Sequence, residues 1–188
     1  MNVLIAEDET LIRLDLRDMI ERAGLYVCAE AHDGEQAVAL ARTTEPDVAI
    51  LDVKMPSLDG VEAARQILRD RPIPIVIISA YTEQALVERA ADAGVFGYLA
   101  KPFREQDLLP AIATAQARFN ELTAVREEVE TLSDALAARK AIERAKGILM
   151  AKDSLTEDAA FARLRKASQT SGRPMRVIAE AVIEAFAT

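Results

Sequence analysis

Carboxylates follow two apolar runs of the sequence, and they are the residues whose type and spacing first indicate chemistry. Glu7 and Asp8 come directly after the first apolar run, and Asp52 ends the third. If both runs are strands of one parallel sheet, their carboxyl ends meet at the same edge. Converging carboxylates repel unless a cation neutralises them, and Mg²⁺ takes oxygen ligands. We therefore expect a Mg²⁺ site made by Glu7, Asp8, Asp52 and the backbone carbonyl of Lys54, rather than a solvated acidic rim.

Two further polar residues are expected at the same edge. Ser79 ends the fourth apolar run, and Lys101 follows the fifth. A carboxylate, a metal ion, an ammonium group and a hydroxyl together make a phosphoryl-transfer site, because the cations neutralise the phosphoryl oxygens while the carboxylate attacks in line. The joint placement of these groups supports this interpretation more than any one of them does. It predicts Asp52 as the phosphoacceptor, with Ser79 and Lys101 binding the phosphoryl group.

The spacing of apolar residues predicts the elements that bring these groups together. Five short runs, at residues 3–6, 26–29, 48–51, 73–78 and 97–99, indicate strands, and four of them are nearly continuous Val, Ile, Leu and Ala. Such runs are typical of strands buried on both faces. The segments between them have helical periodicity and stop at Gly or Pro. Residues 1–120 are therefore predicted to form a doubly wound α/β domain with a five-stranded parallel sheet.

A long helical segment without a breaker follows this domain. No Gly or Pro occurs between Pro110 and Gly147. Within it, five apolar residues alternate at spacings of three and four, with charged residues on both sides, which is the pattern of a coiled-coil seam. A helix that packs this stripe on its own domain is the alternative, but the seam is narrower than a globular helix face. We predict a coiled-coil linker over residues 121–138 that joins two copies of the chain through Leu122, Val125, Val129, Leu132 and Leu136.

The last 50 residues, 139–188, differ from the rest of the chain in charge and pattern. They carry 10 Lys/Arg against 6 Asp/Glu, a net charge of +4, whereas residues 1–120 carry 12 against 20, a net charge of −8. A basic end on an acidic protein indicates an anionic partner, although solvated basic faces explain the charge equally well. The apolar spacing predicts a small three-helix domain, with Thr156 as a helix cap and Phe161 and Leu164 on an apolar helix face.

The segment 52–60, DVKMPSLDG, resembles the D-x-x-M-P-x-x-D-G signature of response-regulator receiver domains. The pairs Glu7-Asp8, Ser79-Ala80 and Lys101-Pro102 fall in the order and spacing of that family, although Glu7 stands where aspartate is commoner. The resemblance implies a flavodoxin-like fold in which Asp52 accepts phosphate from the phosphohistidine of a sensor histidine kinase. It further implies a cis Lys101–Pro102 peptide, slow hydrolysis of the acyl phosphate, and a switch in which Ser79 turns toward the phosphoryl group and Tyr98 moves inward.

The segments 139–150, RKAIERAKGILM, and 160–167, AFARLRKA, resemble the ANTAR family. The resemblance implies an output domain that binds paired RNA hairpins in nascent transcripts and favours antitermination. Arg139 and Lys146 are predicted to lie away from the apolar helix face, exposed to phosphate. Gly147 in mid-helix indicates the close approach of RNA or of another helix. The candidate RNA contacts are Arg139, Arg144, Lys146, Gly147, Arg165 and Lys166, with Arg176 as a further one.

Three functions compete for this sequence: a phosphorylation-controlled RNA-binding antiterminator, a DNA-binding or protein-binding transcription regulator, and a phosphotransfer enzyme acting on small metabolites. Against a helix-turn-helix, the turn at 171–174 precedes an apolar helix with only one early arginine, Arg176. Against an enzyme, Lys54 stands two residues after the nucleophile, where such enzymes typically place a second aspartate. We therefore expect the antiterminator, with no enzymatic activity beyond self-phosphorylation and slow autodephosphorylation at Asp52.

Composition predicts a cytoplasmic protein without a membrane segment. The apolar share is 51% and the charged share 29%, as in soluble globular proteins. The apolar runs stop well short of the ~20 residues that a membrane span needs. The start of the chain meets acidic residues by Glu7 and has no basic region before them, so it does not resemble a signal peptide. The only cysteine, Cys28, forms no internal disulfide, which fits a reducing compartment.

Overall fold

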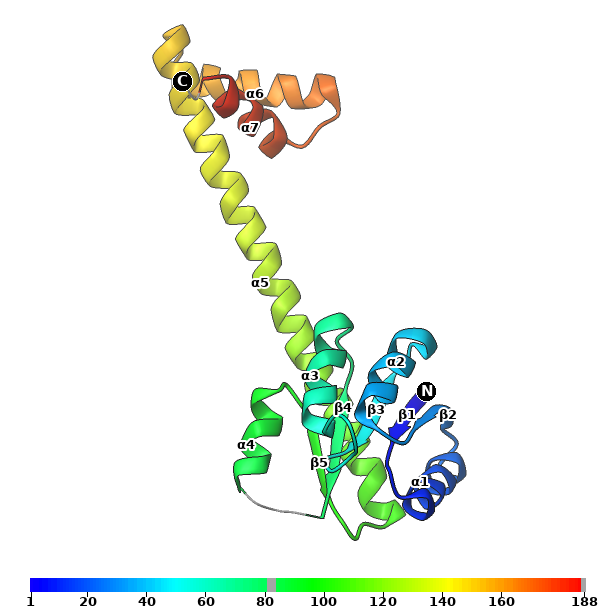
Figure 1. Cartoon of the computed structure of the whole chain (residues 1–188). Coiled ribbons are helices and arrows are strands. Elements are labelled where there is room, and N and C mark those ends of the chain that lie inside the picture. Colours follow the sequence, from blue (N-terminus) through cyan, green and yellow to red (C-terminus); the bar gives the residue numbers. More distant parts are fainter. Residues whose placement is uncertain (81–83, 187–188) are drawn as a thin grey trace. The chain divides into compact units, whose positions relative to one another are not determined.

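The computed structural model describes residues 1–80 and 84–186 (Figure 1), and the chain divides into two compact units, Met1–Thr123 and Ala124–Thr188. The first unit holds a five-stranded parallel sheet with the strand order β2-β1-β3-β4-β5. The strands are β1 (Asn2–Ala6), β2 (Tyr26–Ala31), β3 (Val48–Asp52), β4 (Ile75–Ser79) and β5 (Gly97–Ala100). The predicted doubly wound α/β fold is confirmed, with its switch point between β1 and β3.

Helices cover both faces of the sheet, and alternate strand residues feed two separate cores. Val3 and Ile5 of β1 pack on one face beneath α1 (Thr10–Arg22) and the first turns of α5 (Glu105–Asp153). Leu4 and Ala6 pack on the other face. Three helices cover that second face: α2 (Gly34–Thr44), α3 (Gly60–Asp70) and α4 (Gln84–Asp92). Since both faces are covered, the strands are continuous apolar runs rather than alternating ones.

Short polar residues begin the helices that lead away from the sheet. Asp33 accepts a hydrogen bond from the Gln36 amide at 2.7 Å and caps α2. Asp59 accepts from the Glu62 amide at 2.9 Å and caps α3. These side chains satisfy amide groups that the first helical turn leaves without a backbone acceptor. The caps therefore fix where each helix starts relative to the strand end before it.

The second unit consists of the last part of α5, α6 (Glu157–Ser171) and α7 (Met175–Ala185). Its core is small and contains mostly alanine and leucine: Ala145, Leu149, Ala160, Leu164 and Ala179. The predicted three helices are present, but the first is no separate element, because α5 continues unbroken through the linker segment. A single exposed glycine costs a helix only about 1 kcal/mol, so Gly147 does not interrupt it.

Two details of α6 follow from its sequence, and one differs from expectation. Thr156 caps the helix as predicted, accepting a hydrogen bond from the Ala159 amide at 3.3 Å. Gly172 ends it with a φ of +67°, a conformation that glycine adopts without strain. Phe161, which the apolar spacing places on the same helix side as Leu164, is 41% exposed, whereas Leu164 is buried. The other helices of this unit cover too narrow a stripe of α6 to include it.

Among the described helices, none combines the length and the apolar character that crossing a membrane would require.

A substitution at Gly60, the first residue of α3, tests the close contact between that helix and the end of β3. Its amide donates to the Val53 carbonyl at 2.9 Å, and a Cβ added to Gly60 would lie 1.9 Å from the Asp52 carbonyl oxygen. We expect Gly60→Ala to lower the free energy of unfolding of the first unit by about 1–3 kcal/mol or more, as overpacking does. Urea denaturation followed by tyrosine fluorescence measures this, since all three tyrosines lie before residue 120.

Gly147→Ala is the matched control for this substitution. An added Cβ there meets nothing within 4 Å among the described residues, so it should raise helix stability by up to ~1 kcal/mol and leave the first unit unchanged. An unchanged urea midpoint in Gly60→Ala would contradict the close approach of Gly60 to Asp52.

Candidate functional site

Three carboxylates converge where β1 and β3 end. The two strands are neighbours, with Ala6 paired to Leu51, so the residues that follow them lie side by side. Oxygen atoms of Glu7, Asp8 and Asp52 all lie within 4.8 Å of one another. Glu7 is fully buried and Asp52 is 4% exposed, whereas Asp8 faces solvent. The predicted convergence of these acids at the switch point of the sheet is therefore present.

Lys101 supplies the positive charge that these buried acids need. Its Nζ lies 2.7 Å from Glu7 Oε2 and 2.8 Å from Asp52 Oδ1. The other carboxylate oxygen of Asp52, Oδ2, accepts a hydrogen bond from the Lys54 amide at 2.9 Å. One ammonium group thus joins the ends of β1 and β3 to the loop after β5. Leaving either acid buried without a partner would cost several kcal/mol.

The pKa values of the three groups reflect burial and this pairing. Burial raises the pKa of Glu7, and that of Asp52, above the ordinary carboxyl values, although hydrogen bonds from Lys101 act in the opposite direction. Burial alone would lower the pKa of Lys101, but hydrogen bonds to Asp52 and Glu7 more than offset this and raise it. The carboxylates therefore carry an unfavourable electrostatic energy that a further cation would relieve.

The cavity beside these groups suits a hard cation and a phosphoryl group. It has a volume of about 260 Å³ and is lined by Asp8, Glu9, Asp52, Lys54, Ser79, Ala80 and Lys101. Carboxylate oxygens are the donors that Mg²⁺ takes, and the open side at Asp8 leaves room for the water ligands that this ion keeps. The residues present therefore fit a magnesium ion.

The two remaining predicted site residues are Ser79, the last residue of β4, and Tyr98, within β5. Ser79 is buried, and its carbonyl accepts a hydrogen bond from the Lys101 amide at 2.7 Å. Tyr98 is half-buried and packs against the core beneath α2, α3 and α4. The Lys101–Pro102 peptide is cis, as the family resemblance implied.

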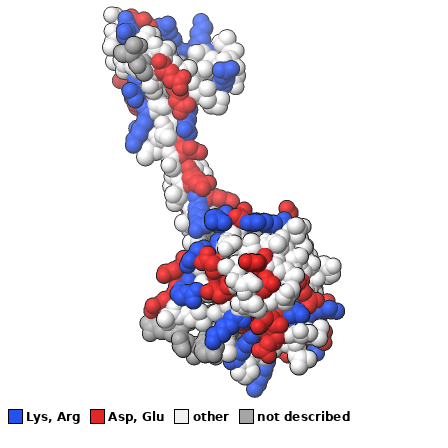
Figure 2. Space-filling view, viewed as in Figure 1, with Lys and Arg blue, Asp and Glu red and all other residues white. Residues whose placement is uncertain are grey.

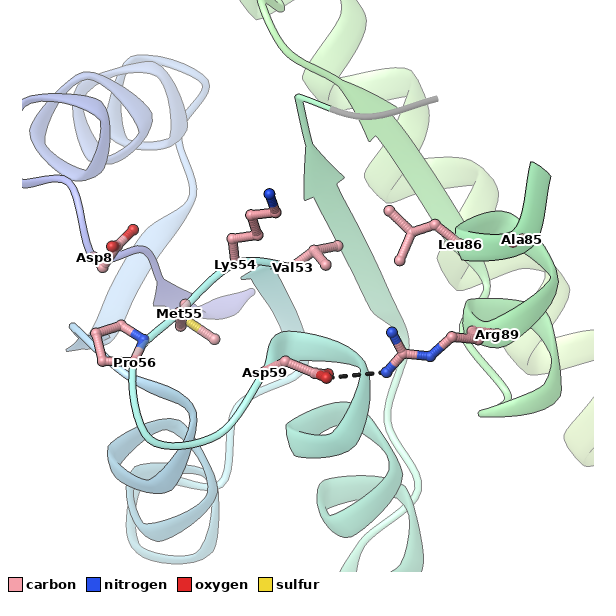
Figure 3. Close-up of a pocket in the computed structure, with 9 residues that line it drawn as sticks. All are labelled: Asp8, Val53, Lys54, Met55, Pro56, Asp59, Ala85, Leu86 and Arg89. Carbon is pink, nitrogen blue, oxygen red and sulfur yellow. Dashed lines mark hydrogen bonds and ion pairs between the residues drawn. The ribbon is translucent and has the colours of Figure 1, made fainter. Parts of the chain in front are cut away.

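A larger pocket of about 690 Å³ opens between the loop after β3 and α4 (Figure 3). Arg89 reaches across from α4, and its Nη2 lies 2.9 Å from Asp59 Oδ2. Burial alone would raise the pKa of Asp59, but hydrogen bonds from the Glu62 amide and Arg89 bring it below its usual value. Arg89 does not stand out in the sequence, because an arginine on a helix flank resembles many solvated charges.

Lys and Arg atoms of the second unit are visible at its surface (Figure 2), and these residues fall into two groups. Four of the predicted RNA contacts are exposed, and within residues 1–80 and 84–186 no ion pair or side-chain hydrogen bond engages them: Arg139, Arg144, Arg165 and Lys166. Arg176 differs, because its guanidinium lies 2.8 Å from Glu180 Oε1 and 3.0 Å from Asp134 Oδ1. The first group is available to an anionic partner, and Arg176 is already engaged.

Lys146 departs from its predicted position. The prediction that it is exposed is wrong, because Lys146 is only 7% exposed. Its Nζ lies 2.6 Å from Glu157 Oε1 and 3.0 Å from Glu143 Oε2. These hydrogen bonds raise the pKa of Lys146 and lower that of Glu157. Lys146 therefore ties the start of α6 to α5.

Gly147 and the linker stripe lie open to solvent. Among the described residues nothing lies within 4 Å of a Cβ added at Gly147, so no described helix of this unit approaches it. The close approach of RNA, or of a helix from outside this unit, stays a prediction. The five seam residues are 41–62% exposed, so the alternative that this stripe packs on its own domain is wrong: Leu122, Val125, Val129, Leu132 and Leu136.

Comparisons with known proteins match both units. The family model "Response regulator receiver domain" matches residues 3–113, and the model "ANTAR domain" matches residues 130–183. The chain is 48% identical to the transcriptional regulatory protein PdtaR of Mycobacterium tuberculosis over 186 residues, 99% of this chain and 91% of the relative. It is 34% identical to the chemotaxis protein CheY of Thermotoga maritima over 111 residues, 58% of this chain and 92% of the relative.

Solved structures match over the first unit. The signal receiver domain of a modulated diguanylate cyclase from Desulfovibrio desulfuricans G20 is 34% identical with a TM-score of 0.59, covering 63% of this chain and 95% of that chain. The response regulator domain of Thermotoga maritima CheB is 29% identical with a TM-score of 0.58, covering 62% of this chain and 96% of that chain.

The position of Lys146 yields a test that separates a structural role from a phosphate contact. We expect Lys146→Ala to speed amide hydrogen exchange across α6, because Glu143 and Glu157 lose their shared counter-ion and the contact between the helices loosens. Mass spectrometry of peptides from residues 157–171 measures this. Lys140→Ala is the matched control, since Lys140 is exposed on the same helix.

A role of Lys146 as a phosphate contact predicts a different result in hydrogen exchange and RNA binding. Unchanged exchange in Lys146→Ala, together with a salt dependence of RNA binding that is shallower by about 1, would make Lys146 a phosphate contact.

Proposed function

The chain belongs to the response regulators, with an N-terminal receiver domain and a C-terminal ANTAR domain, and we propose that phosphorylation of its Asp52 controls RNA-binding antitermination. The phosphate comes from the phosphohistidine of a sensor histidine kinase, and the target is hairpin RNA in nascent transcripts. The observation that carries the proposal is the convergence of Glu7, Asp8 and Lys101 on Asp52. Nascent transcripts and kinase phosphohistidines are both reached from the cytoplasm, so we place the protein there.

In this proposal Asp52 is the nucleophile of the receiver domain. A carboxylate oxygen of Asp52 forms a bond to phosphorus as the bond to the histidine nitrogen breaks, and the imidazole leaves with the electron pair. Glu7, Asp8, Asp52 and the carbonyl of Lys54 would hold Mg²⁺, which when bound neutralises phosphoryl oxygens. The ammonium of Lys101 and the hydroxyl of Ser79 bind the remaining oxygens. The chain carries out this self-phosphorylation and a slow autodephosphorylation, and no further catalysis.

The output domain offers separate, unpaired cations to RNA. Hairpin loops expose bases to side chains, while the flanking phosphates attract basic residues. The four exposed basic residues and the open backbone at Gly147 are the proposed contact surface: Arg139, Arg144, Arg165 and Lys166. DNA readout is less favoured, because Arg176, the only basic residue of α7, is held by Glu180 and Asp134.

The linker is proposed to join two copies of the chain as a parallel coiled coil. The a positions of the heptads are Leu122, Val129 and Leu136, so Glu121 is a g position and Arg126 an e position. In a parallel coiled coil, Glu121 of one chain lies beside Arg126 of the other. Two such pairs form by symmetry. An antiparallel arrangement would instead bring g positions of both chains together, which are Glu121 and Glu128. Charge therefore favours the parallel pairing.

Phosphorylation reaches the output domain through α5 in this proposal. The helix begins at Glu105, shortly after Lys101, and its residues Leu108 and Ile112 are buried against the sheet. The same helix carries the exposed seam. Movement of Ser79 and Tyr98 on phosphorylation would shift the packing of α5 and alter the affinity of the seam for its partner.

A titration with nucleic acids tests the proposed function. Full-length protein is titrated with a paired-hairpin RNA and with a duplex DNA, with and without a small phosphodonor and Mg²⁺. We expect RNA binding that strengthens on phosphorylation, because linking two modules raises the effective concentration of the second. Asp52→Asn should remove the effect of the phosphodonor but not basal RNA binding. Preferred binding of the duplex, or of neither nucleic acid with Asp52 phosphorylated, would contradict RNA as the target.

Charge reversal tests the parallel pairing. Sedimentation equilibrium should show a weaker dimer for Arg126→Glu, since Glu121 then faces a like charge, and recovery in the double variant Glu121→Arg/Arg126→Glu. Each pair at such a rim is worth about 0.2–1 kcal/mol, and two pairs change together. Leu132→Lys, which places a charge in the seam, should abolish the dimer. A double variant that dimerises as weakly as Arg126→Glu alone would argue against parallel pairing. Equal dimer affinity of the phosphorylated protein and the Asp52→Asn variant would argue against control of the dimer by phosphorylation.

A further inference from the structure

Phe161 is an aromatic side chain left uncovered on α6. Its neighbours Ala160 and Leu164 are buried in the core of the output domain, but Phe161 is 41% exposed. The other exposed phenylalanine of this domain, Phe186, is 42% exposed and has Lys152 Nζ at 5.5 Å from its ring centroid. Within the described part of the chain, no ring or cation contact engages Phe161.

Polar side chains extend from Phe161 along the same stripe of the helix. Arg165 lies one turn later and Gln169 a further turn later, so the three residues share one face. Arg165 and Gln169 are exposed, and no hydrogen bond or ion pair engages either within residues 1–80 and 84–186. By contrast, Arg163 on a different face of α6 forms an ion pair with Asp153. The stripe therefore presents an aromatic ring, a guanidinium group and an amide that are all free to bind.

These three chemistries match what recognises an unstacked base. A flat ring supports a base by stacking, a guanidinium binds phosphate or the edge of guanine, and an amide pairs with the edge of adenine. A protein partner is a poorer match, because one ring bordered by polar side chains falls short of the contiguous apolar patch that protein docking uses. The net charge of +4 over residues 139–188 also favours an anionic occupant (10 Lys/Arg against 6 Asp/Glu).

We infer that Phe161, Arg165 and Gln169 form a base-reading stripe, in which one unpaired loop nucleotide of the hairpin stacks on the Phe161 ring. Arg165 and Gln169 then contact the edge or the phosphate of that nucleotide and its neighbour. This inference rests on the proposed RNA-binding function and adds to it the residue that distinguishes loop from stem. The exposed basic residues elsewhere hold phosphates and carry little sequence information.

The test uses full-length protein and hairpin RNA in which each loop position in turn carries 2-aminopurine or an abasic site. We expect one loop position whose fluorescence is quenched on binding and whose abasic form binds about 5- to 150-fold more weakly, the range of one lost base stack. Phe161→Leu, which keeps an apolar side chain without a ring, should lose the same factor and the quenching. Phe161→Tyr should retain both, and Phe186→Leu is the matched control at equal exposure.

The outcomes separate this inference from the function on which it rests. Abasic RNA and Phe161→Leu should not add their losses, because each removes the same stack. If wild-type protein binds hairpin RNA but no loop position is quenched, the stripe is overturned and the RNA-binding function stands. The same conclusion follows if Phe161→Leu binds the RNA as tightly as wild type. Wild-type protein that binds no hairpin RNA overturns both. Phe161→Leu that changes only the sedimentation of the protein assigns the ring to a protein interface and overturns the stripe.

Discussion

Two buried carboxylates share one ammonium group at the carboxyl edge of the sheet, and the architecture of the receiver domain depends on that contact. Glu7 and Asp52 end neighbouring strands, where the fold brings them together whether or not they are neutralised. Lys101 arrives from the loop after β5 and lies within 2.8 Å of both. The loop positions on either side of the sheet edge are thereby fixed. One ammonium group balances the charge of only one of the two carboxylates, so the site keeps a net negative charge and is receptive to a divalent cation.

A second lysine between two carboxylates lies in the output domain, and it differs from Lys101 in how far its two partners are buried. Lys146 bridges Glu143 and Glu157, but these acids are 59% and 67% exposed. Water solvates their charge, so the cluster carries little electrostatic strain and serves to hold two helices together. Glu7 and Asp52 have almost no such solvation. The same residue types therefore make a buried, electrostatically strained site in one domain and a solvated link between helices in the other.

One continuous helix serves three purposes along its length. The first turns of α5 bury Leu108 and Ile112 against the sheet, the middle presents the uncovered seam, and the end supplies Ala145 and Leu149 to the core of the output domain. The part of α5 between Pro110 and Gly147 holds no helix breaker, so its backbone hydrogen bonds resist bending more than a flexible linker would.

The sequence by itself determined the features that depend on local pattern. Strand and helix alternation, the seam from Leu122 to Leu136, the Thr156 cap and the motif around Asp52 each follow from spacing within a few residues. The packing of helices in the output domain did not follow, because it depends on residues far apart in the chain. Lys146 is buried beneath a hydrogen bond to Glu157 of the next helix, and Arg176 donates a hydrogen bond to Asp134, 42 positions earlier in the chain.

Only the tertiary structure decided which charged and aromatic side chains remained free. Phe161 has the same periodicity as buried Leu164, but the neighbouring helices of this small domain cover only part of α6. Arg163 and Arg165 are of the same type and two residues apart, yet among the described residues only Arg163 forms an ion pair with an acid. Helical periodicity specifies a face, whereas the width of the face that becomes buried is set by how closely its neighbours pack.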